Sequence, residues 1–357
     1  MYSSRIRTVA KVAGVVALSA LVLTGCRGGT AEEGAGTRGA SLSVNSFGGV
    51  WQEGLQKEVV TPFEEASGIS VGLTTALGAE ALTLMRGDSA VFDMAYMDLA
   101  IVEQAKDAGL LQTLDLDKVP NAKDLYPLAV DDDGYWVAYI TSMTGIAYNT
   151  EAVDTAPTSW KDLWSDEYAG HVAISNVSGT VGHQFLVQAA KMNGGDENNI
   201  DPGFTAIEEL MPNVVSIYNT PDEMSRLLTS GEAWIGPWYA DRTGALKASG
   251  APVAFVEPEE GAIAVISTMV IPKDAANVDG AYEYMNFQLA AEVNSAFVQA
   301  TGLGPVNSKS KLPAEYLAEN YVPYGDEQVG KLQAFDSAAI SKHLSDWIER
   351  WNTEIAG

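Results

Sequence analysis

The spacing of apolar residues in the first part of the chain alternates between a period of two and a period near four. Ser41–Ser46 alternates as a strand does, whereas Trp51–Ala66 carries Leu55, Val59 and Phe63 four residues apart, on one face of a helix. The same patterns predict, in chain order, the strand Ile69–Thr74, the helix Ala79–Arg86, the strand Phe92–Met97 and the helix Leu99–Ala108. This succession predicts an α/β fold with a parallel or mixed sheet and helices on both faces.

A second α/β unit follows a turn at Asp131–Gly134, where Asp-Gly precedes the alternating segment Tyr135–Tyr139. The chain enters this unit near Ser142–Gly145. Its expected elements are Val172–Ser175, Val181–Met192, Pro202–Leu210, Val214–Tyr218 and Ala233–Pro237. A strand at Ile263–Ile271 then looks like a return crossing. Two lobes joined by two crossing segments predict a cleft, which is where small ligands usually bind.

The lobes can be assigned to residue ranges on this basis. Lobe 1 is expected to hold residues 41–142 together with about 268–305. Lobe 2 is expected to hold residues 143–267 together with about 306–357. About 150 residues per domain is an ordinary size, so the length of 357 residues accommodates this division.

The first 25 residues have the pattern of a signal peptide. Arg5, Arg7 and Lys11 precede the apolar run Val12–Leu23, which as a helix would span roughly 18 Å, too short for a bilayer core of about 30 Å. The run ends in Leu23-Thr24-Gly25-Cys26. This tetrapeptide resembles the bacterial lipobox, in which cleavage precedes the cysteine and its sulfur receives a diacylglyceryl group. The alternative is that Cys26 is merely a small residue of a secretory leader.

Residues 26–40 are rich in Gly, Thr, Ala and Glu and show no periodicity, so a flexible tether is expected after the lipidated Cys26. The protein is accordingly predicted to be exported. It would be lipid-anchored to the outer face of the cytoplasmic membrane, or face the periplasm.

Charge and composition exclude several classes of protein. Lys and Arg number 21 against 47 Asp and Glu, and the formal charge of −26 would repel a nucleic-acid backbone or an anionic membrane surface. A hydrophobic content of 46% suits a soluble globular protein with a substantial core. One cysteine cannot form an internal disulfide, and three scattered histidines show no zinc spacing. No metal or cofactor is therefore expected.

A family resemblance rests on several segments taken in sequence order: Ser46–Gln52, Pro62–Ile69, Gly145–Asn149, Thr158–Trp164 with Tyr168–Gly170, Glu259–Ala262, Ile271–Ala275 and Trp347–Asn352. Together they resemble the extracellular solute-binding proteins of ABC importers, most closely the spermidine/putrescine-binding branch. The resemblance runs from about Ser41 to the C-terminus. It implies a two-lobed periplasmic-binding-protein fold of type II, a small amine-containing ligand, delivery to a membrane permease with a cytoplasmic ATPase, no enzymatic activity, and a monomer.

The resemblance also implies ligand contacts at a Trp-x-x-Asp motif, here Trp238-Tyr239-Ala240-Asp241. In a polyamine binder, aromatic faces hold methylenes and ammonium groups while carboxylates neutralise charge. Trp238 is thus expected to stack on the ligand and Asp241 to accept a hydrogen bond from its cation. Alternatively, Trp238 packs in the core, and Asp241 pairs with Arg242 or caps a helix.

Other candidate ligand contacts follow predicted strands. Phe47, Gly48 and Trp51 come just after the first strand, where an open α/β sheet places its ligand cleft, although Trp51 could equally be a core residue of its helix. Gly48 would let a ligand approach the backbone, or simply form a tight turn. Asp98 ends the third strand and either reaches the cleft or caps the next helix.

Two regions depart from the polyamine pattern. Asn176 and Ser178-Gly179-Thr180 offer neutral groups and a helix N-terminus where polyamine binders usually carry acids; this suits a carboxylate, phosphonate or phosphate, or is an ordinary helix cap. Val265, Ser267 and Leu303 stand where relatives carry an aromatic residue, an acid and a tyrosine. The cleft is therefore expected to be less acidic than the binding of a diamine requires. An amino acid, a phosphonate or another anionic solute stays an alternative ligand.

A secreted hydrolase is a remote alternative. Gly68–Gly72 matches the Gly-x-Ser-x-Gly elbow by letters, with Ser70 as the nucleophile. That elbow requires a strand, then Ser, then a helix, whereas this segment is predicted to join a helix to a strand.

Overall fold

The computed structural model describes residues 41–76, 78–87 and 91–357. The predicted signal peptide, Cys26 and the tether lie outside the described residues. Nine strands are present in this part of the chain: β1 (Ser41–Ser46), β2 (Ser70–Thr75), β3 (Met94–Asp98), β4 (Val137–Asn149), β5 (Val172–Ser175), β6 (Val214–Tyr218), β7 (Ile235–Tyr239), β8 (Val253–Val256) and β9 (Ile263–Val270).

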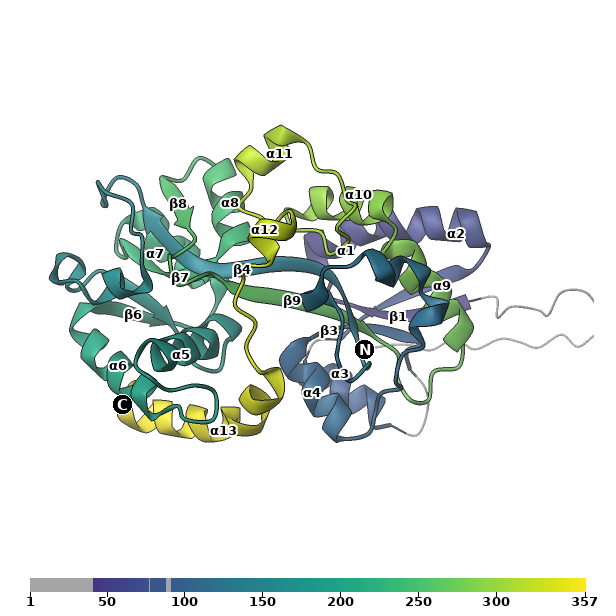
Figure 1. Ribbon diagram of the computed structural model, residues 1–357, viewed down its shortest axis with the longest axis horizontal. Helices are drawn as coiled ribbons and strands as arrows, with labels where there is room; N and C mark the ends of the chain where they lie inside the picture. Colours follow the sequence, from purple (N-terminus) through teal and green to yellow (C-terminus); the bar gives the residue numbers. More distant parts are fainter. Residues whose placement is uncertain (1–40, 77, 88–90) are drawn as a thin grey trace, which may run out of the picture. The chain divides into compact units, whose positions relative to one another are not determined.

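The strands form one mixed sheet in the order β2-β1-β3-β9-β4-β7-β5-β6, with β8 also paired to β4. Strands β1, β2 and β3 are parallel at one end, and β5, β6 and β7 are parallel at the other. Between them, β4 and β9 run antiparallel to each other and to their outer neighbours β7 and β3. Figure 1 shows these two strands side by side where the two halves of the sheet meet. They are the two crossing segments of the predicted fold.

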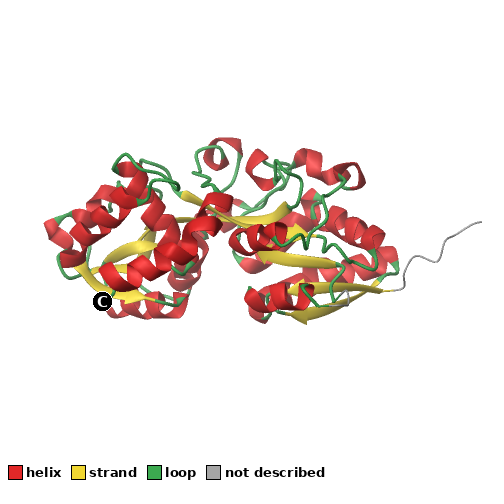
Figure 2. Ribbon diagram, turned by 90° about the horizontal axis from the view of Figure 1, so that it is seen from below, coloured by secondary structure: helices red, strands yellow, loops and turns green. Residues whose placement is uncertain are grey.

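Helices flank the strands on both sides (Figure 2). In the first half they are α1 (Gly49–Leu55), α2 (Thr61–Ser67), α3 (Ala79–Met85) and α4 (Leu99–Asp107). The second half has α5 (Thr180–Met192), α6 (Asp201–Leu210), α7 (Pro221–Ser230) and α8 (Ala240–Ala248). The last part of the chain contributes α9 (Val278–Gln288), α10 (Ala291–Thr301), α11 (Ala314–Glu319), α12 (Asp326–Val329) and α13 (Ser337–Glu354).

The helix predicted over Trp51–Ala66 is interrupted by a π-helical turn at Gln56–Val60, between α1 and α2. The amide of Thr61 donates to the carbonyl of Gln56, five residues back. Pro62 follows at the start of α2 and has no N–H to contribute to the helical ladder, which accounts for the irregularity at this point.

Two large buried clusters lie in the two halves. The first packs β1 and β3 against helices that include α9 and α10, with Val44, Met94 and Phe297 fully buried. The second packs β5 against α5, α6 and α13, with Trp160, Phe204 and Trp351 at most 1% exposed. The lobe boundaries drawn from the sequence stay a prediction. No helix among the described residues is long and apolar enough to span a bilayer.

Candidate functional site

A cavity of about 850 Å³ lies at the strand ends around the crossing strands β4 and β9. Its walls come from the ends of β1, β3 and β7, from β4 and β9 themselves, and from the first turns of α4, α5, α8 and α13. The carboxyl ends of the parallel strands and the N-termini of the helices that follow them meet here, which is where open α/β sheets place ligands. Both halves of the sheet therefore contribute side chains to one cavity.

Eight of the twelve predicted ligand contacts line this cavity. They are Phe47, Gly48, Trp51, Asp98, Thr180, Tyr239, Asp241 and Ser267. Val265 and Leu303, which stand where the polyamine pattern has aromatic residues, also line it. The cavity thus gathers residues that are more than 200 positions apart in the chain.

Trp238 does not reach the cavity, so the expected stacking of its ring on a ligand is wrong. Its side chain is fully buried in a small core cluster with Met224 and Leu228, and its indole N–H has no hydrogen-bond partner among the described residues. Successive side chains of a strand point to opposite faces, so the next residue of β7, Tyr239, faces the cavity instead. Trp238 occupies the core position that was the alternative reading.

Asn176, Ser178 and Gly179 also lie outside the cavity lining. The side-chain oxygen of Asn176 accepts hydrogen bonds from the Ser178 backbone N–H at 3.0 Å and from its hydroxyl at 2.8 Å. Gly179 is the N-cap residue of α5, without a side-chain cap. These polar groups are engaged in the turn that starts the helix, and Thr180 is the residue of this segment that lines the cavity.

An aromatic wall closes the side of the cavity formed by β1 and α1. Trp51 makes edge-to-face contacts with Phe47, Tyr96 and Tyr139, with centroid distances of 5.2, 4.9 and 5.8 Å. Phe47 and Trp51 are only half-buried, whereas Tyr96 and Tyr139 are buried behind them. Trp51 therefore packs against neighbouring rings and also exposes ring surface to the cavity. Both interpretations of this residue, as a core residue and as a ligand contact, are compatible with this position. Such rings hold methylenes and ammonium groups.

Asp98 lies directly opposite Ser267 in the antiparallel pairing of β3 with β9. It is accessible to solvent inside the cavity, yet protein surrounds it closely enough that desolvation raises the pKa of its carboxyl, while a hydrogen bond from Ser267 lowers it. Tyr139 in turn donates to Ser267 at 3.1 Å. None of the ion pairs found among the described residues involves Asp98.

Asp241 lies in the first turn of α8 on the other side of the crossing strands. Burial raises the pKa of its carboxyl, against lowering by a 2.6 Å hydrogen bond from the Ser142 hydroxyl and by the positive charge of Arg242. Burial raises the pKa of Tyr239 to about 12; a hydrogen bond with Thr180 lowers it, and the charges of Asp98 and Asp241 both raise it. Tyr239 is therefore within electrostatic reach of both carboxylates.

The family model for bacterial extracellular solute-binding proteins matches residues 89–329. The chain belongs to this family.

Similar proteins agree with that assignment. Spermidine/putrescine-binding periplasmic protein 1 of Haemophilus influenzae is 28% identical over 323 residues, covering 85% of this chain and 88% of the relative. The spermidine/putrescine-binding periplasmic protein of Escherichia coli is 26% identical over 292 residues, covering 79% and 83%. The crystal structure of an ABC transporter from Clostridium perfringens superposes with a TM-score of 0.81 at 28% identity, covering 88% of this chain and 99% of that chain. The predicted α/β two-lobed fold is confirmed.

Several cavity residues of this solute-binding protein were not singled out in its sequence. Gln184 accepts a hydrogen bond from Thr144 of β4 at 2.7 Å and donates to the Ala264 carbonyl of β9 at 3.0 Å, contacts between residues 40 and 80 positions apart. His183 follows Thr180 by three residues on α5, a spacing that places both on one helix face and could have identified it. Arg242 also lines the cavity and directly follows Asp241, which was a predicted ligand contact.

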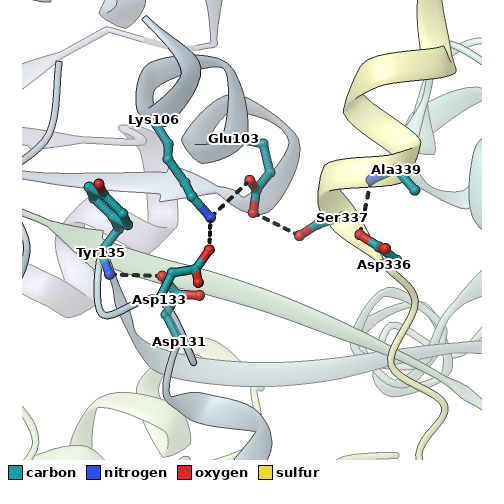
Figure 3. Close-up of polar contacts among 8 residues, drawn as sticks. All are labelled: Glu103, Lys106, Asp131, Asp133, Tyr135, Asp336, Ser337 and Ala339. Atoms are coloured by element: carbon teal, nitrogen blue, oxygen red, sulfur yellow. Dashed lines mark hydrogen bonds and ion pairs between the residues drawn. The ribbon is translucent and has the colours of Figure 1, made fainter. Parts of the chain in front are cut away.

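One polar contact beside the cavity joins α4 to the start of α13 (Figure 3). Ser337, which lines the cavity, donates a 2.9 Å hydrogen bond to the carboxylate of Glu103, which is 5% exposed. Lys106 lies 3.6 Å from the same carboxylate and also pairs with Asp133 of the predicted turn. Asp336 caps α13 by accepting from the Ala339 N–H at 2.9 Å. This contact connects a helix of the first half with a helix packed in the second.

Metal ligands do not cluster in the part of the chain that the structure describes: it holds no group of three or more His, Cys, Asp or Glu side chains suited to an ion. Ser70 begins β2 directly after α2 and Gly68, so the segment runs from helix to strand. It therefore lacks the strand-to-helix geometry of a nucleophile elbow, as the sequence pattern predicted.

Proposed function

We propose that this protein is the substrate-binding component of an ABC importer and captures a small amine-containing solute of the polyamine type. Two carboxylates, Asp98 and Asp241, line one cavity, and burial raises the pKa of each. An ammonium group bound at each carboxylate would offset the cost of keeping it ionised. This pair of cavity-lining carboxylates is the observation that carries the proposal, and the two relatives named for spermidine and putrescine support it.

The aromatic wall complements these charges. Trp51 and Phe47 present accessible ring surface to the cavity, and such surface packs against methylenes and attracts cations. Val265 and Leu303 add apolar lining. A short aliphatic chain that carries two separated ammonium groups matches the apolar walls and the two separated acids.

The ligand would act by favouring a closed arrangement of the two halves, since it contacts both and binds that arrangement more tightly. The closed protein would then dock on a membrane permease that a cytoplasmic ATPase drives. In this function the protein is a monomer without catalytic activity, attached to the outer face of the membrane through lipidated Cys26. Mass spectrometry of the mature protein tests the anchor: a diacylglyceryl adduct on an N-terminal Cys26 supports it, and a chain that starts elsewhere contradicts it.

An amine titration tests the ligand class. Tryptophan fluorescence of the purified protein is followed with putrescine, spermidine, γ-aminobutyrate, aminoethylphosphonate and a purely anionic dicarboxylate. The proposal expects saturable responses to at least one amine, with loss of binding in the Asp98→Asn/Asp241→Asn double variant. Saturable binding of the dicarboxylate without any response to an amine would contradict it.

A further inference from the structure

Arg242 brings a positive charge into a cavity whose other charged groups are acidic. It is the one lysine or arginine among the described residues that line the cavity, and it follows Asp241 in the first turn of α8. Its Nε atom lies 3.9 Å from the Asp241 carboxylate, beyond hydrogen-bond distance, and its side chain is 58% exposed. Among the described residues its guanidinium makes no hydrogen bond. Its planar fork of donors is therefore available to a carboxylate on a ligand.

The three charges form a pattern that a simple diamine does not match. The two ammonium groups of a bound diamine would neutralise Asp98 and Asp241, but Arg242 would then repel the ammonium group at Asp241. A ligand that carries one carboxylate as well satisfies all three groups. The separation of 3.9 Å between Arg242 and Asp241 suits an ammonium and a carboxylate attached to the same carbon atom.

The second ammonium group would lie at Asp98. In the sheet order, β3 with Asp98 is separated from β7, which leads into Asp241, by β9 and β4. Three strand spacings of about 4.8 Å place these backbones roughly 14 Å apart, and Asp98 and Asp241 both line the cavity. An aliphatic chain running past Tyr239 would connect the two sites, since both carboxylate charges act on this phenol.

We propose that the solute is a basic α-amino acid, a diamine that carries one carboxylate, and that Arg242 determines this specificity by binding the carboxylate. This inference rests on the proposed amine-binding function and narrows its ligand class. The nearby lining agrees with it, since Val265 and Ser267 add no third acid that a more highly charged polyamine would require.

Ornithine and putrescine form a matched pair of probes, because putrescine is ornithine without its carboxylate. Calorimetry gives the Kd of each for the wild type, Arg242→Gln and Arg242→Lys. The wild type should prefer ornithine by about tenfold or more, the value of one charge-assisted hydrogen bond. Arg242→Gln should lose about tenfold for ornithine and gain a few-fold for putrescine, reversing the preference. Arg242→Lys keeps the charge without the fork and should be intermediate.

Arg226→Gln is the matched control, since Arg226 is exposed on α7 and pairs with Glu232 outside the cavity. It should alter neither affinity. A wild type that prefers putrescine would overturn the inference while leaving the amine-binding function intact. An equal loss for both ligands in Arg242→Gln would also overturn it, because Arg242 would then act only through Asp241. A wild type that binds neither probe nor any other amine would contradict both proposals.

Discussion

Ser142 and Asp241 are joined by a 2.6 Å hydrogen bond that runs from the crossing strand β4 to the first turn of α8. The hydroxyl donates to a carboxylate that faces the cavity, and it lowers a carboxyl pKa that burial raises. Ser142 therefore favours the ionised form of Asp241 and fixes the direction of its carboxylate, although it need not touch the ligand itself. This relationship makes Ser142 a positioning residue for the proposed cation site.

Removal of this hydroxyl should change the pH dependence of binding. In Ser142→Ala the pKa of Asp241 should rise further, so amine affinity should begin to fall at a higher pH than in the wild type. At neutral pH we expect a loss of about fivefold, corresponding to about 1 kcal/mol for one hydrogen bond. Calorimetric Kd values between pH 4.5 and 8 measure both effects. Ser249→Ala, at the far end of α8, is the control, and identical profiles for the two variants would refute this role.

Asp98→Asn should move affinity and stability in opposite directions. Affinity for an amine should fall roughly thirtyfold, since the loss of an ionic hydrogen bond costs on the order of 2 kcal/mol. Because the folded-state pKa of Asp98 is raised above its ordinary value of 3.8, the folded protein binds the proton more tightly than the unfolded chain. The ionised group therefore lowers stability as pH rises through this range, and the neutral Asn should raise the unfolding free energy at pH 7.

Urea unfolding and calorimetry on the same preparation measure this pair of effects. Asp132→Asn is the control, because Asp132 is exposed in the turn before β4 and lies outside the cavity lining. A destabilised Asp98→Asn protein would contradict this prediction, because the carboxylate would then stabilise the fold.

Fluorescence should distinguish Trp51 from Trp238, the two tryptophans considered as ligand contacts, by their contribution to the ligand-induced change in emission. Trp51 lines the cavity, whereas Trp238 is fully buried away from it. Trp51→Phe should therefore lose most of the ligand-induced change in emission, and Trp238→Phe should retain it. Trp238→Ala should lower the unfolding free energy by about 3–5 kcal/mol, as for other buried aromatic truncations. Loss of the ligand signal in Trp238→Phe alone would reverse the assignment.

His183 should make the protein less stable in acid. Burial lowers its pKa to about 4 from an ordinary value of 6.5, against a hydrogen bond to the Val177 backbone that raises it. Between these values the unfolded chain binds a proton that the folded protein does not, so stability falls as pH drops from about 6.5 towards 4. The expected loss between pH 7 and pH 5 is roughly 2 kcal/mol. His183→Gln should remove this loss in urea unfolding, and the half-buried His343→Gln should not.

The hydrogen bond between Glu103 and Ser337 should appear as a coupling energy. A double-mutant cycle with Glu103→Gln and Ser337→Ala isolates it from the other contacts of α4 and α13. We expect about 1–2 kcal/mol in the unfolding free energy, since the acceptor is a buried carboxylate. Additive effects of the two substitutions would mean that the contact contributes nothing to joining these helices.

Local patterns predicted several strands, although β8 was not predicted and β7 lies two residues beyond the predicted Ala233–Pro237. The bounds of β1, β5 and β6 agree with the predicted Ser41–Ser46, Val172–Ser175 and Val214–Tyr218. Helix α9 was not assigned, because its buried residues, which include Tyr282, Tyr284 and Met285, lie on more than one side of the helix and tyrosine also favours strands. The length of β4, 13 residues, was missed because pairing with β9 and then with β7 and β8 sustains it, and no local pattern encodes such pairings.

Local patterns likewise could not predict which residues of the site lie next to one another. Asp98 could be located because it directly follows the predicted strand Phe92–Met97. Tyr239 and Asp241 were singled out through the resemblance at Trp238–Asp241, since the predicted strand Ala233–Pro237 ended before them. Tyr239 faces the cavity because the small core cluster with Met224 and Leu228 lies on the other side of β7, where it buries Trp238. The pairing of Asp98 with Ser267 depends on β9 returning beside β3. Tertiary topology decides these relationships, and a single sequence does not display it.

A crystal structure of the protein with the amine that binds most tightly tests the central claim most directly. We expect ligand in the cavity with an ammonium nitrogen about 2.7–2.9 Å from a carboxylate oxygen of Asp98 or Asp241. A ligand bound outside the cavity, or one that places no cationic group at either carboxylate, would contradict it.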